Sequence, residues 1–249
     1  MISVQNVSKR FGSQVVLDGV SLEIKPGQTT AVVGPSGVGK SVLLKLIMGI
    51  LSPEKGEIFV DGRNITAAKT EAEKNEIRAA VGVLFQSAAL FDSLSVYDNV
   101  AFPLHERTRL SREAIHAKVV AMLESLSLTE YAWDYPEEIS IGIRKRVGMA
   151  RSLIMEPKFL LFDEPNTGLD PLVGQEVYDL IKTSRKEWGF TGVVISHEIP
   201  EVFQVSDRVV MLLNAQVAAE GTPEELLRSE NPAVQQFLQG RIDGPIKIQ

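Results

Sequence analysis

The chain has 249 residues, of which 44% are hydrophobic and 23% are charged, and its formal net charge is −6. This composition is ordinary for a globular protein, and the acidic balance disfavours a protein that binds nucleic acid through a basic surface. The absence of cysteine excludes disulfides, zinc–thiolate sites and thiol nucleophiles. No apolar run reaches the about 18 residues of a transmembrane helix, and the N-terminus lacks the basic and apolar segments of a signal peptide.

The first 25 residues alternate between apolar and polar side chains, which predicts strands with one buried face. Among them, Phe11 follows Lys9 and Arg10 at a turn. The spacing allows two interpretations of Phe11: a minor core residue, or an exposed ring that stacks on a nucleotide base.

Residues 34–41 read Gly-Pro-Ser-Gly-Val-Gly-Lys-Ser and fit the phosphate-binding pattern G-x-x-x-x-G-K-[S/T]. Glycines let the backbone curl so that several N–H groups point at one anion, Lys40 adds a cation, and the Ser41 hydroxyl is placed to bind Mg²⁺. A buried parallel strand is predicted just before the loop, over residues 29–33. A dinucleotide-binding G-x-G-x-x-G is disfavoured because Val42 stands where its third glycine should be. Apolar residues after the loop recur at helical spacing: Val42, Leu43, Leu46, Ile47 and Ile50.

The next segments predict a hairpin closed at Asp61-Gly62, then a loop and a helix over residues 63–79. Residues 81–85 predict another buried strand, which ends at Gln86. Because ligands of open α/β sheets lie beyond the carboxyl ends of the strands, Gln86 is either a solvated side chain or part of a site. The apolar stretch Ala88–Tyr97 either packs under its own subdomain or docks a partner.

Residues 87–155 show helical patterns, with Ser111 as one predicted N-cap, and are inserted between predicted strands. A continuous apolar run over residues 159–162 then predicts a strand with Asp163 and Glu164 at its tip. Paired with a phosphate loop, these carboxylates predict a phosphate-transferring site. Asp163 would hold Mg²⁺, and Glu164 would orient and deprotonate the attacking water.

Further along, Asp170 and Pro171 predict a helix start. A buried strand over residues 192–196 ends at His197, and this position favours a catalytic histidine over a structural one. The remaining segments predict a strand pair around Asn214-Ala215, a capping-box helix from Thr222, a helix from Asn231 and an extended stretch over the last nine residues.

The order of these motifs resembles the ATP-binding cassette ATPases of ABC transporters over essentially the whole chain. It comprises the phosphate loop, Gln86, an S-x-G signature at Ser140, Asp163-Glu164, the segment 166–170 and His197. The resemblance implies an α/β fold of the P-loop NTPase type, with a RecA-like core, an antiparallel β subdomain and an inserted helical subdomain. We expect a single domain over residues 1–249, in which 1–86 and 156–222 form the core and β subdomain, 87–155 the helical subdomain, and 223–249 the C-terminal helices and tail.

The resemblance also implies a head-to-tail homodimer that holds two ATP molecules between its subunits. It implies that Phe11 stacks on adenine and that Mg²⁺ is bound by Ser41, Gln86 and Asp163. Glu164 would polarise the attacking water, and His197 would contact the γ-phosphate. Ser140 and Gly142 would reach the γ-phosphate bound to the other subunit, with Asp170 at the dimer seam. The implied phosphate-binding residues are Gly34, Pro35, Ser36, Gly37, Val38, Gly39, Lys40, Ser41 and Val42.

Three shorter features are similar to the Mla/Mkl-type bacterial phospholipid transporters. They are Val42, where most relatives have threonine, the stretch 84–94, and the tail 237–245. This subgroup implies an integral inner-membrane permease and an MCE-domain lipid-binding protein as partners, with the ATPase peripheral on the cytoplasmic face of the inner membrane. It also implies phospholipid as the cargo that ATP hydrolysis moves.

The signature departs from the usual L-S-G-G-[Q/M] because Ile141 replaces a glycine. A β-branched residue forbids a positive φ and adds bulk where backbone approaches a phosphate, so we expect either slow hydrolysis or a shifted loop. The alternatives are therefore an ATP-gated binding module with little hydrolysis, and the same motor serving another cargo. ABC ATPases of repair or translation generally need two cassettes or long insertions, and the motifs of serine hydrolases and zinc proteases are absent.

Overall fold

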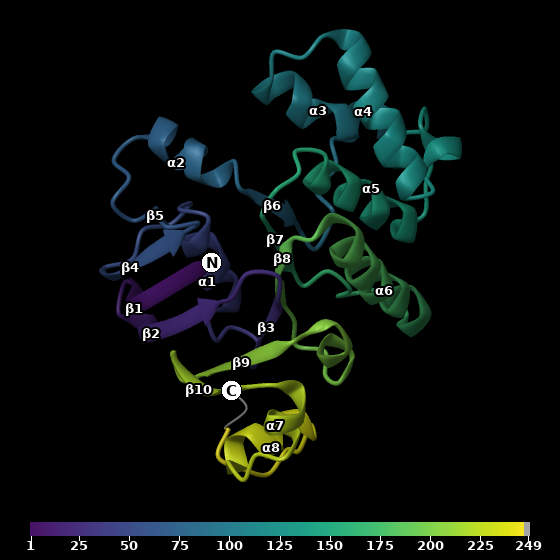
Figure 1. Ribbon diagram of the computed structural model, residues 1–249. Helices are drawn as coiled ribbons and strands as arrows, with labels where there is room; N and C mark the ends of the chain where they lie inside the picture. Colours follow the sequence, from purple (N-terminus) through teal and green to yellow (C-terminus); the bar gives the residue numbers. More distant parts are fainter. Residues whose placement is uncertain (247–249) are drawn as a thin grey trace. The chain divides into compact units, whose positions relative to one another are not determined.

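The computed structural model describes residues 1–246. The chain divides into two compact units, the first made of Met1–Arg78 and the chain from Phe190 onward, the second of Ala79–Gly189. Each unit contains both strands and helices, so the α/β class predicted from the sequence is confirmed (Figure 1). Within residues 1–246, no helix is long and apolar enough to cross a bilayer.

The first unit contains an antiparallel sheet with the strand order β2-β1-β4-β5. The predicted alternation is confirmed on β2, where Val20, Leu22 and Ile24 are buried and the residues between them are exposed. The hairpin turn at Asp61 (φ 52°) and Gly62 (φ 77°) has the left-handed pair that a tight two-residue turn needs. The strands are β1 (Ile2–Phe11), β2 (Gln14–Ile24), β4 (Lys55–Val60) and β5 (Arg63–Asn64).

The same unit contains a second run of paired strands in the order β10-β9-β3-β8. Strand β3 (Thr29–Val33) is parallel to both β8 (Thr191–Ile195) and β9 (Arg208–Leu213). Every residue of β3 and β8 is buried, as the continuous apolar runs predict for a covered parallel sheet. Strand β10 (Gln216–Gly221) returns antiparallel to β9 through the predicted turn.

Helix α1 (Lys40–Ile47) follows the phosphate loop and buries Leu43, Leu44 and Leu46. The prediction that Ile50 continues its apolar face is wrong, since Ile50 is 57% exposed. The helix ends earlier because Gly49 is left-handed (φ 63°). A Cβ on Gly49 would lie 2.7 Å from the Ile65 side chain, so the chain turns here without one.

The C-terminal part of the first unit contains the short helices α7 (Pro223–Leu227) and α8 (Pro232–Leu238), which lie side by side (Figure 1). The predicted capping box at Thr222 is present. The predicted extended tail is wrong for residues 241–246, which form bends. The buried Gln236 side chain bonds to the backbone of Arg241, Ile242 and Ile246 and holds them back against α8. The end of the predicted stretch, 247–249, lies outside the described residues.

The second unit contains a parallel pair, β6 (Val81–Leu84) and β7 (Phe159–Asp163), with Leu84 opposite Phe162. The predicted burial is confirmed for β7 but is wrong for the first three residues of β6, which are half-buried. The reason is that β6 is the last strand in its sheet.

Helices α3 (Val96–Arg107), α4 (Arg112–Ser125) and α5 (Ile141–Leu153) separate these two strands in the chain and pack on one another (Figure 1). The helices predicted between the strands are therefore confirmed. The N-caps are also confirmed: Ser111 Oγ accepts from Ala114 N, and Asp170 caps α6 (Pro171–Trp188), where Pro171 is the first residue.

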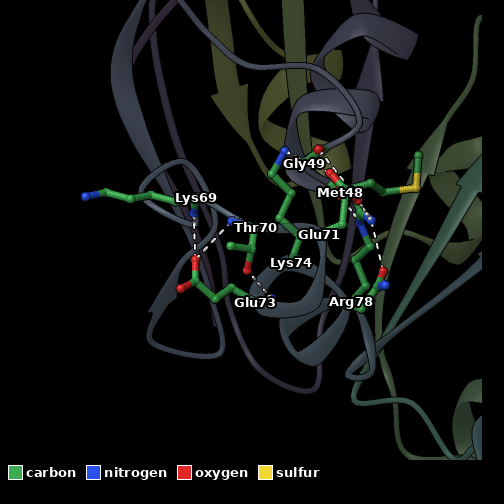
Figure 2. A network of polar contacts seen from close by, with 9 residues as sticks. Met48, Gly49, Lys69, Thr70, Glu71, Glu73, Lys74 and Arg78 are labelled. Carbon is green, nitrogen blue, oxygen red and sulfur yellow. Dashed lines mark hydrogen bonds and ion pairs between the residues drawn. The ribbon is translucent and has the colours of Figure 1, made fainter.

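Helix α2 (Glu71–Arg78) is tied to the end of α1 by Arg78 (Figure 2). Its guanidinium donates to Met48 O at 2.8 Å and Gly49 O at 3.0 Å, and it pairs with Glu71 at 2.8 Å. Carbonyls at a helix C-terminus lack intrahelical partners, and a cation there also favours the helix dipole. Arg78 thus stabilises the far end of the helix that begins at the phosphate loop.

We expect Arg78→Met to lower the free energy of unfolding by about 2 kcal/mol, because two carbonyls lose a charged donor. Urea denaturation measures this value. The matched control is Arg63→Met, which removes an exposed ion pair between Arg63 of β5 and Glu76 of α2. That loss should stay below about 0.5 kcal/mol, and equal losses in the two variants would contradict the capping role.

Candidate nucleotide site

The phosphate loop lies in the first unit, between β3 and α1. Gly34, Gly37 and Gly39 have φ values of 146°, 77° and 107°. A Cβ on Gly34 would lie 2.3 Å from Leu212 O, and one on Gly39 would lie 2.9 Å from Val16 O. These two glycines are needed because the loop passes against neighbouring backbone, and side chains would block its path.

Lys40 is buried, with 4% of its surface exposed, and starts α1. Its Nζ donates to Gly34 O at 2.8 Å and Pro35 O at 3.0 Å, so the ammonium lies inside the curve of the loop. Ser41 and Val42 follow in the first turn of α1, whose N-terminus carries partial positive charge. A buried cation beside a helix N-terminus favours an anion such as phosphate at this position.

A cavity of about 940 Å³ lies beside the loop, within the size range of small-molecule sites. Phe11 is 48% exposed at the end of β1, which rules out the core interpretation. Its backbone pairs with that of Gln14, which lines the cavity. Its stacking on adenine stays a prediction. The lining comprises Gln14, Val15, Val16, Asp18, Pro35, Ser36, Gly37, Val38, Leu213, Asn214, Ala215, Pro245 and Ile246.

His197 lies two residues beyond β8, and it is exposed. Parallel register pairs Val32 of β3 with Ile195 of β8, so the phosphate loop and His197 leave the same end of adjacent strands. The predicted position at a strand end is confirmed. The contact with a γ-phosphate stays a prediction.

In the second unit, Gln86 and the Asp163-Glu164 pair also leave one end of adjacent parallel strands, as their register shows. Asp163 is the last residue of β7, and Glu164 has a left-handed backbone (φ 48°). Thr167 Oγ1 donates to Glu164 Oε2 at 3.2 Å and orients this carboxylate. Thr167 belongs to the segment 166–170 of the family resemblance, but sequence reasoning assigned it no role, because its partner Glu164 is fixed only by the turn after β7.

The signature segment forms the start of α5. Ser140 is exposed and caps the helix, its Oγ accepting from Ile143 N at 3.4 Å. Ile141 is the first helical residue and does not have a positive φ, so the expected backbone conflict is wrong. The side chain of Ile141 is half exposed, and a Cβ on Gly142 would make only ordinary contact with Val173 at 3.6 Å.

Helix α5 also contains a buried cation, Lys145, and a half-buried one, Arg151, whose contacts sequence reasoning did not predict. Lys145 Nζ donates to Gln86 O, and Arg151 donates to Ala88 O at 2.7 Å. Burial lowers the pKa of Lys145 to about 8, and burial also lowers the pKa of Arg151. A basic residue in a helical pattern is usually solvated, so the sequence gives no sign of these contacts.

The donor types expected for Mg²⁺ are the Ser41 hydroxyl, the Gln86 side chain and the Asp163 carboxylate. These oxygen donors suit a hard cation. No group of three or more His, Cys, Asp or Glu side chains that could bind a metal gathers in the described part of the chain. A hydroxyl, an amide and one carboxylate are donor types that Mg²⁺ accepts when phosphate supplies further oxygens.

A P-loop between a buried parallel strand and a helix defines this chain as an α/β nucleotide-binding protein of the P-loop class. The profile of the ABC transporter family matches residues 17–167. The chain belongs to this family and is an ABC-type ATPase, as the following relatives also show.

The chain is 41% identical to the intermembrane phospholipid transport system ATP-binding protein MlaF of Haemophilus influenzae, over 100% of this chain and 94% of that protein. It is also 41% identical to the probable ribonucleotide transport ATP-binding protein mkl of Mycobacterium tuberculosis, over 98% of this chain and 68% of that protein. The dimeric ATP-binding cassette MJ0796, solved in a post-hydrolysis state with ADP and Pi, superposes with a TM-score of 0.79 at 30% identity, covering 90% of this chain and 99% of that one.

The lowered pKa of Lys145 predicts a pH-dependent stability. Between about pH 8 and its ordinary pKa of 10.5, the unfolded chain binds more protons at this side chain than the native chain does, so the free energy of unfolding rises with pH. We expect the wild type to gain stability relative to Lys145→Met across this window. Urea denaturation of both proteins at several pH values measures the gain, and a constant difference would contradict it.

Proposed function

We propose that this chain is the ATP-hydrolysing subunit of a transporter that moves phospholipid between membranes through an integral permease. The observation that carries the proposal is the full-length similarity to MlaF, combined with an intact phosphate loop around a buried Lys40. The same similarity supports a peripheral position on the cytoplasmic face of the inner membrane, and an MCE-domain lipid-binding protein as a further partner.

The residues that we assign to ATP binding lie in the first unit. Backbone N–H groups of the phosphate loop and the Lys40 ammonium would hold the β- and γ-phosphates, and Phe11 would stack on adenine. His197, at the same strand ends as the loop, would contact the γ-phosphate. Positioned donors of this kind stabilise the charge on a transferring phosphoryl group.

The residues that we assign to hydrolysis lie in the second unit. Glu164 would orient and deprotonate water, with its carboxylate held by Thr167. Gln86 and Asp163, at the neighbouring strand end, would bind Mg²⁺ with Ser41. When bound, Mg²⁺ would neutralise charge on the phosphate oxygens.

A homodimer is supported by the similarity to a dimeric cassette. In this arrangement Ser140 and Gly142 would face the nucleotide of the other copy, and Asp170 would lie at the seam. Ser140 is exposed at the N-terminus of α5, so its hydroxyl and the helix end are available to an anion outside its own subunit.

The names of the relatives support two cargoes. MlaF is named for phospholipid and mkl for ribonucleotide, at the same identity to this chain. We favour phospholipid because this chain matches almost the whole of MlaF but only about two thirds of mkl. Cargo is chosen by the permease, so the ribonucleotide alternative is tested by identifying the molecule that the assembled complex moves.

An ATP clamp with negligible hydrolysis is the rival activity, prompted by Ile141. The structure weakens its premise, because Ile141 occupies an ordinary helical position. We expect the assembled complex to hydrolyse ATP, Glu164→Gln to lose at least about a hundredfold in kcat, and Ile141→Gly to change kcat less than about threefold. Steady-state phosphate release measures all three.

Binding of ATP without turnover serves as the control, since Glu164→Gln should still bind nucleotide while Lys40→Ala should not. A wild type without turnover that gains it in Ile141→Gly would establish the clamp instead.

The apolar stretch Ala88–Tyr97 is the proposed docking surface for the permease. Some of its residues fit the interpretation of packing within the subdomain, and others fit that of docking a partner. Ala88 and Val96 are buried, whereas Phe91 is 42% exposed and lies 4.6 Å from the ring of Phe102, which is 37% exposed. The buried residues support the fold, and the exposed rings remain available to a partner.

We expect Phe91→Asp combined with Leu90→Asp to abolish co-purification with the permease, because two charges would enter an apolar contact. ATP binding should be unaffected. The matched control is Leu110→Asp, a similarly exposed apolar residue (41%) in the same unit but outside the stretch. Co-purification that survives the double substitution would exclude this surface.

A further inference from the structure

The segment between β6 and α3, residues 85–95, forms neither helix nor strand, so its backbone carbonyls lack the regular partners of a helix or a sheet. One face of α5 supplies them at the base of the segment. Lys145 Nζ donates to Gln86 O, and Arg151 donates to Ala88 O at 2.7 Å. The Arg151 guanidinium also lies 5.6 Å from the centre of the Phe91 ring.

The tip of the segment is fastened to α3 by Asn99, which is fully buried. Its Nδ2 donates to Phe91 O, Leu94 O and Ser95 O at 3.0–3.1 Å, and its Oδ1 accepts from Phe91 N at 2.9 Å. The segment is therefore attached at both ends to helices of its own unit.

Close packing at Gly148 supports the same attachment. A Cβ on Gly148 would lie 2.7 Å from the Leu84 side chain and 3.0 Å from Ala88 Cβ. Glycine lets α5 approach the segment closely enough for its two cations to reach the carbonyls.

The energetics favour joint movement of α5 and the segment. Lys145 is 1% exposed, and a buried ammonium that loses its acceptor is costly. If Gln86 O moved away from α5, the buried Lys145 ammonium would lose its acceptor. A joint movement of α5 and the segment 85–95 would keep this hydrogen bond. Ser140 begins α5 only five residues before Lys145, about 8 Å along a rigid helix.

From these contacts we propose that Lys145 is a positioning residue that makes Gln86 and Ser140 move as one body. The proposal rests on the proposed function, in which Gln86 meets the nucleotide of its own subunit and Ser140 meets that of the other. Lys145 would thereby couple the nucleotide bound at Gln86 to the position of Ser140, which contacts the nucleotide of the other subunit. Arg151 strengthens the attachment two residues further along, at Ala88.

The test is a double-mutant cycle on ATP hydrolysis by the assembled complex. Lys145→Met should lower kcat about tenfold with little change in KM, and Lys145→Arg, which keeps a charged donor, should restore most of it. In a Gln86→Ala background, Lys145→Met should cost less than about twofold, because the side chain that Lys145 positions is already gone. A purely structural role would cost the same in both backgrounds.

The matched control is Ser152→Ala. Ser152 Oγ lies 2.7 Å from Val83 O and from Gly148 O, so this change removes a bond between α5 and β6 without touching Gln86. It should leave kcat within about twofold. Equal losses from Lys145→Met with and without the Gln86 side chain, or no loss at all, would overturn the proposal.

A replacement variant and a second measurement test the proposal if the first experiment fails. If Lys145→Met does not fold, Lys145→Gln, which keeps an N–H donor of shorter reach, enters the same cycle. If the wild type shows no turnover, the proposed hydrolytic function fails, and the wild type and the three variants of the cycle are compared by ATP-dependent dimerisation. Dimerisation that is insensitive to Lys145→Met would then overturn the inference on its own.

Discussion

The nucleotide site depends on a close approach of backbone to backbone at the phosphate loop. Gly34 passes Leu212 O, and Gly39 passes Val16, at separations where an added Cβ would overlap. The strand before the loop, β3, is held rigidly because it is buried and paired on both sides. The backbone that the loop approaches belongs to β9 at Leu212 and to β2 at Val16, so glycine is needed at positions 34 and 39. The carbonyls that curve around Lys40 Nζ follow from this path.

Parallel strands position the candidate site residues that lie outside the phosphate loop. Three candidate residues lie at or just beyond the carboxyl ends of parallel strands: His197 in the first unit, and Gln86 and Asp163 in the second. The buried sheet positions its strand ends, and ligands of open α/β sheets bind beyond these ends. The left-handed backbone of Glu164 fits this view, since local strain of this kind persists where surrounding contacts such as Thr167 hold it.

The sequence predicted the elements that have local signals and missed contacts that depend on tertiary packing. The longer strands of the first unit, the helix caps at Ser111 and Asp170 and the strand-end residues were predicted, because hydrophobic period, caps and turns depend on neighbouring residues. The two-residue strand β5 lies in a segment predicted as loop. The contacts of Lys145 and Asn99 were not predicted. Lys145 bonds to a residue 59 positions away and Asn99 to residues up to eight positions away, and these partners lie on an irregular segment. The tail over residues 241–246 failed for the same reason: one buried glutamine decides its path.

The signature shows how a motif can vary without losing its geometry. A glycine after the serine is necessary only if that position needs a positive φ or a close contact with other backbone. Position 141 needs neither, because Ile141 is the first residue of α5 and half of its side chain is exposed. What the helix start requires is an N-cap and free N–H groups, and Ser140 supplies the cap. The anion-binding capacity of this end resides in backbone and dipole, which an isoleucine leaves unchanged. The departure at Ile141 therefore adds exposed apolar surface at the start of α5 and leaves the backbone of the helix start unchanged.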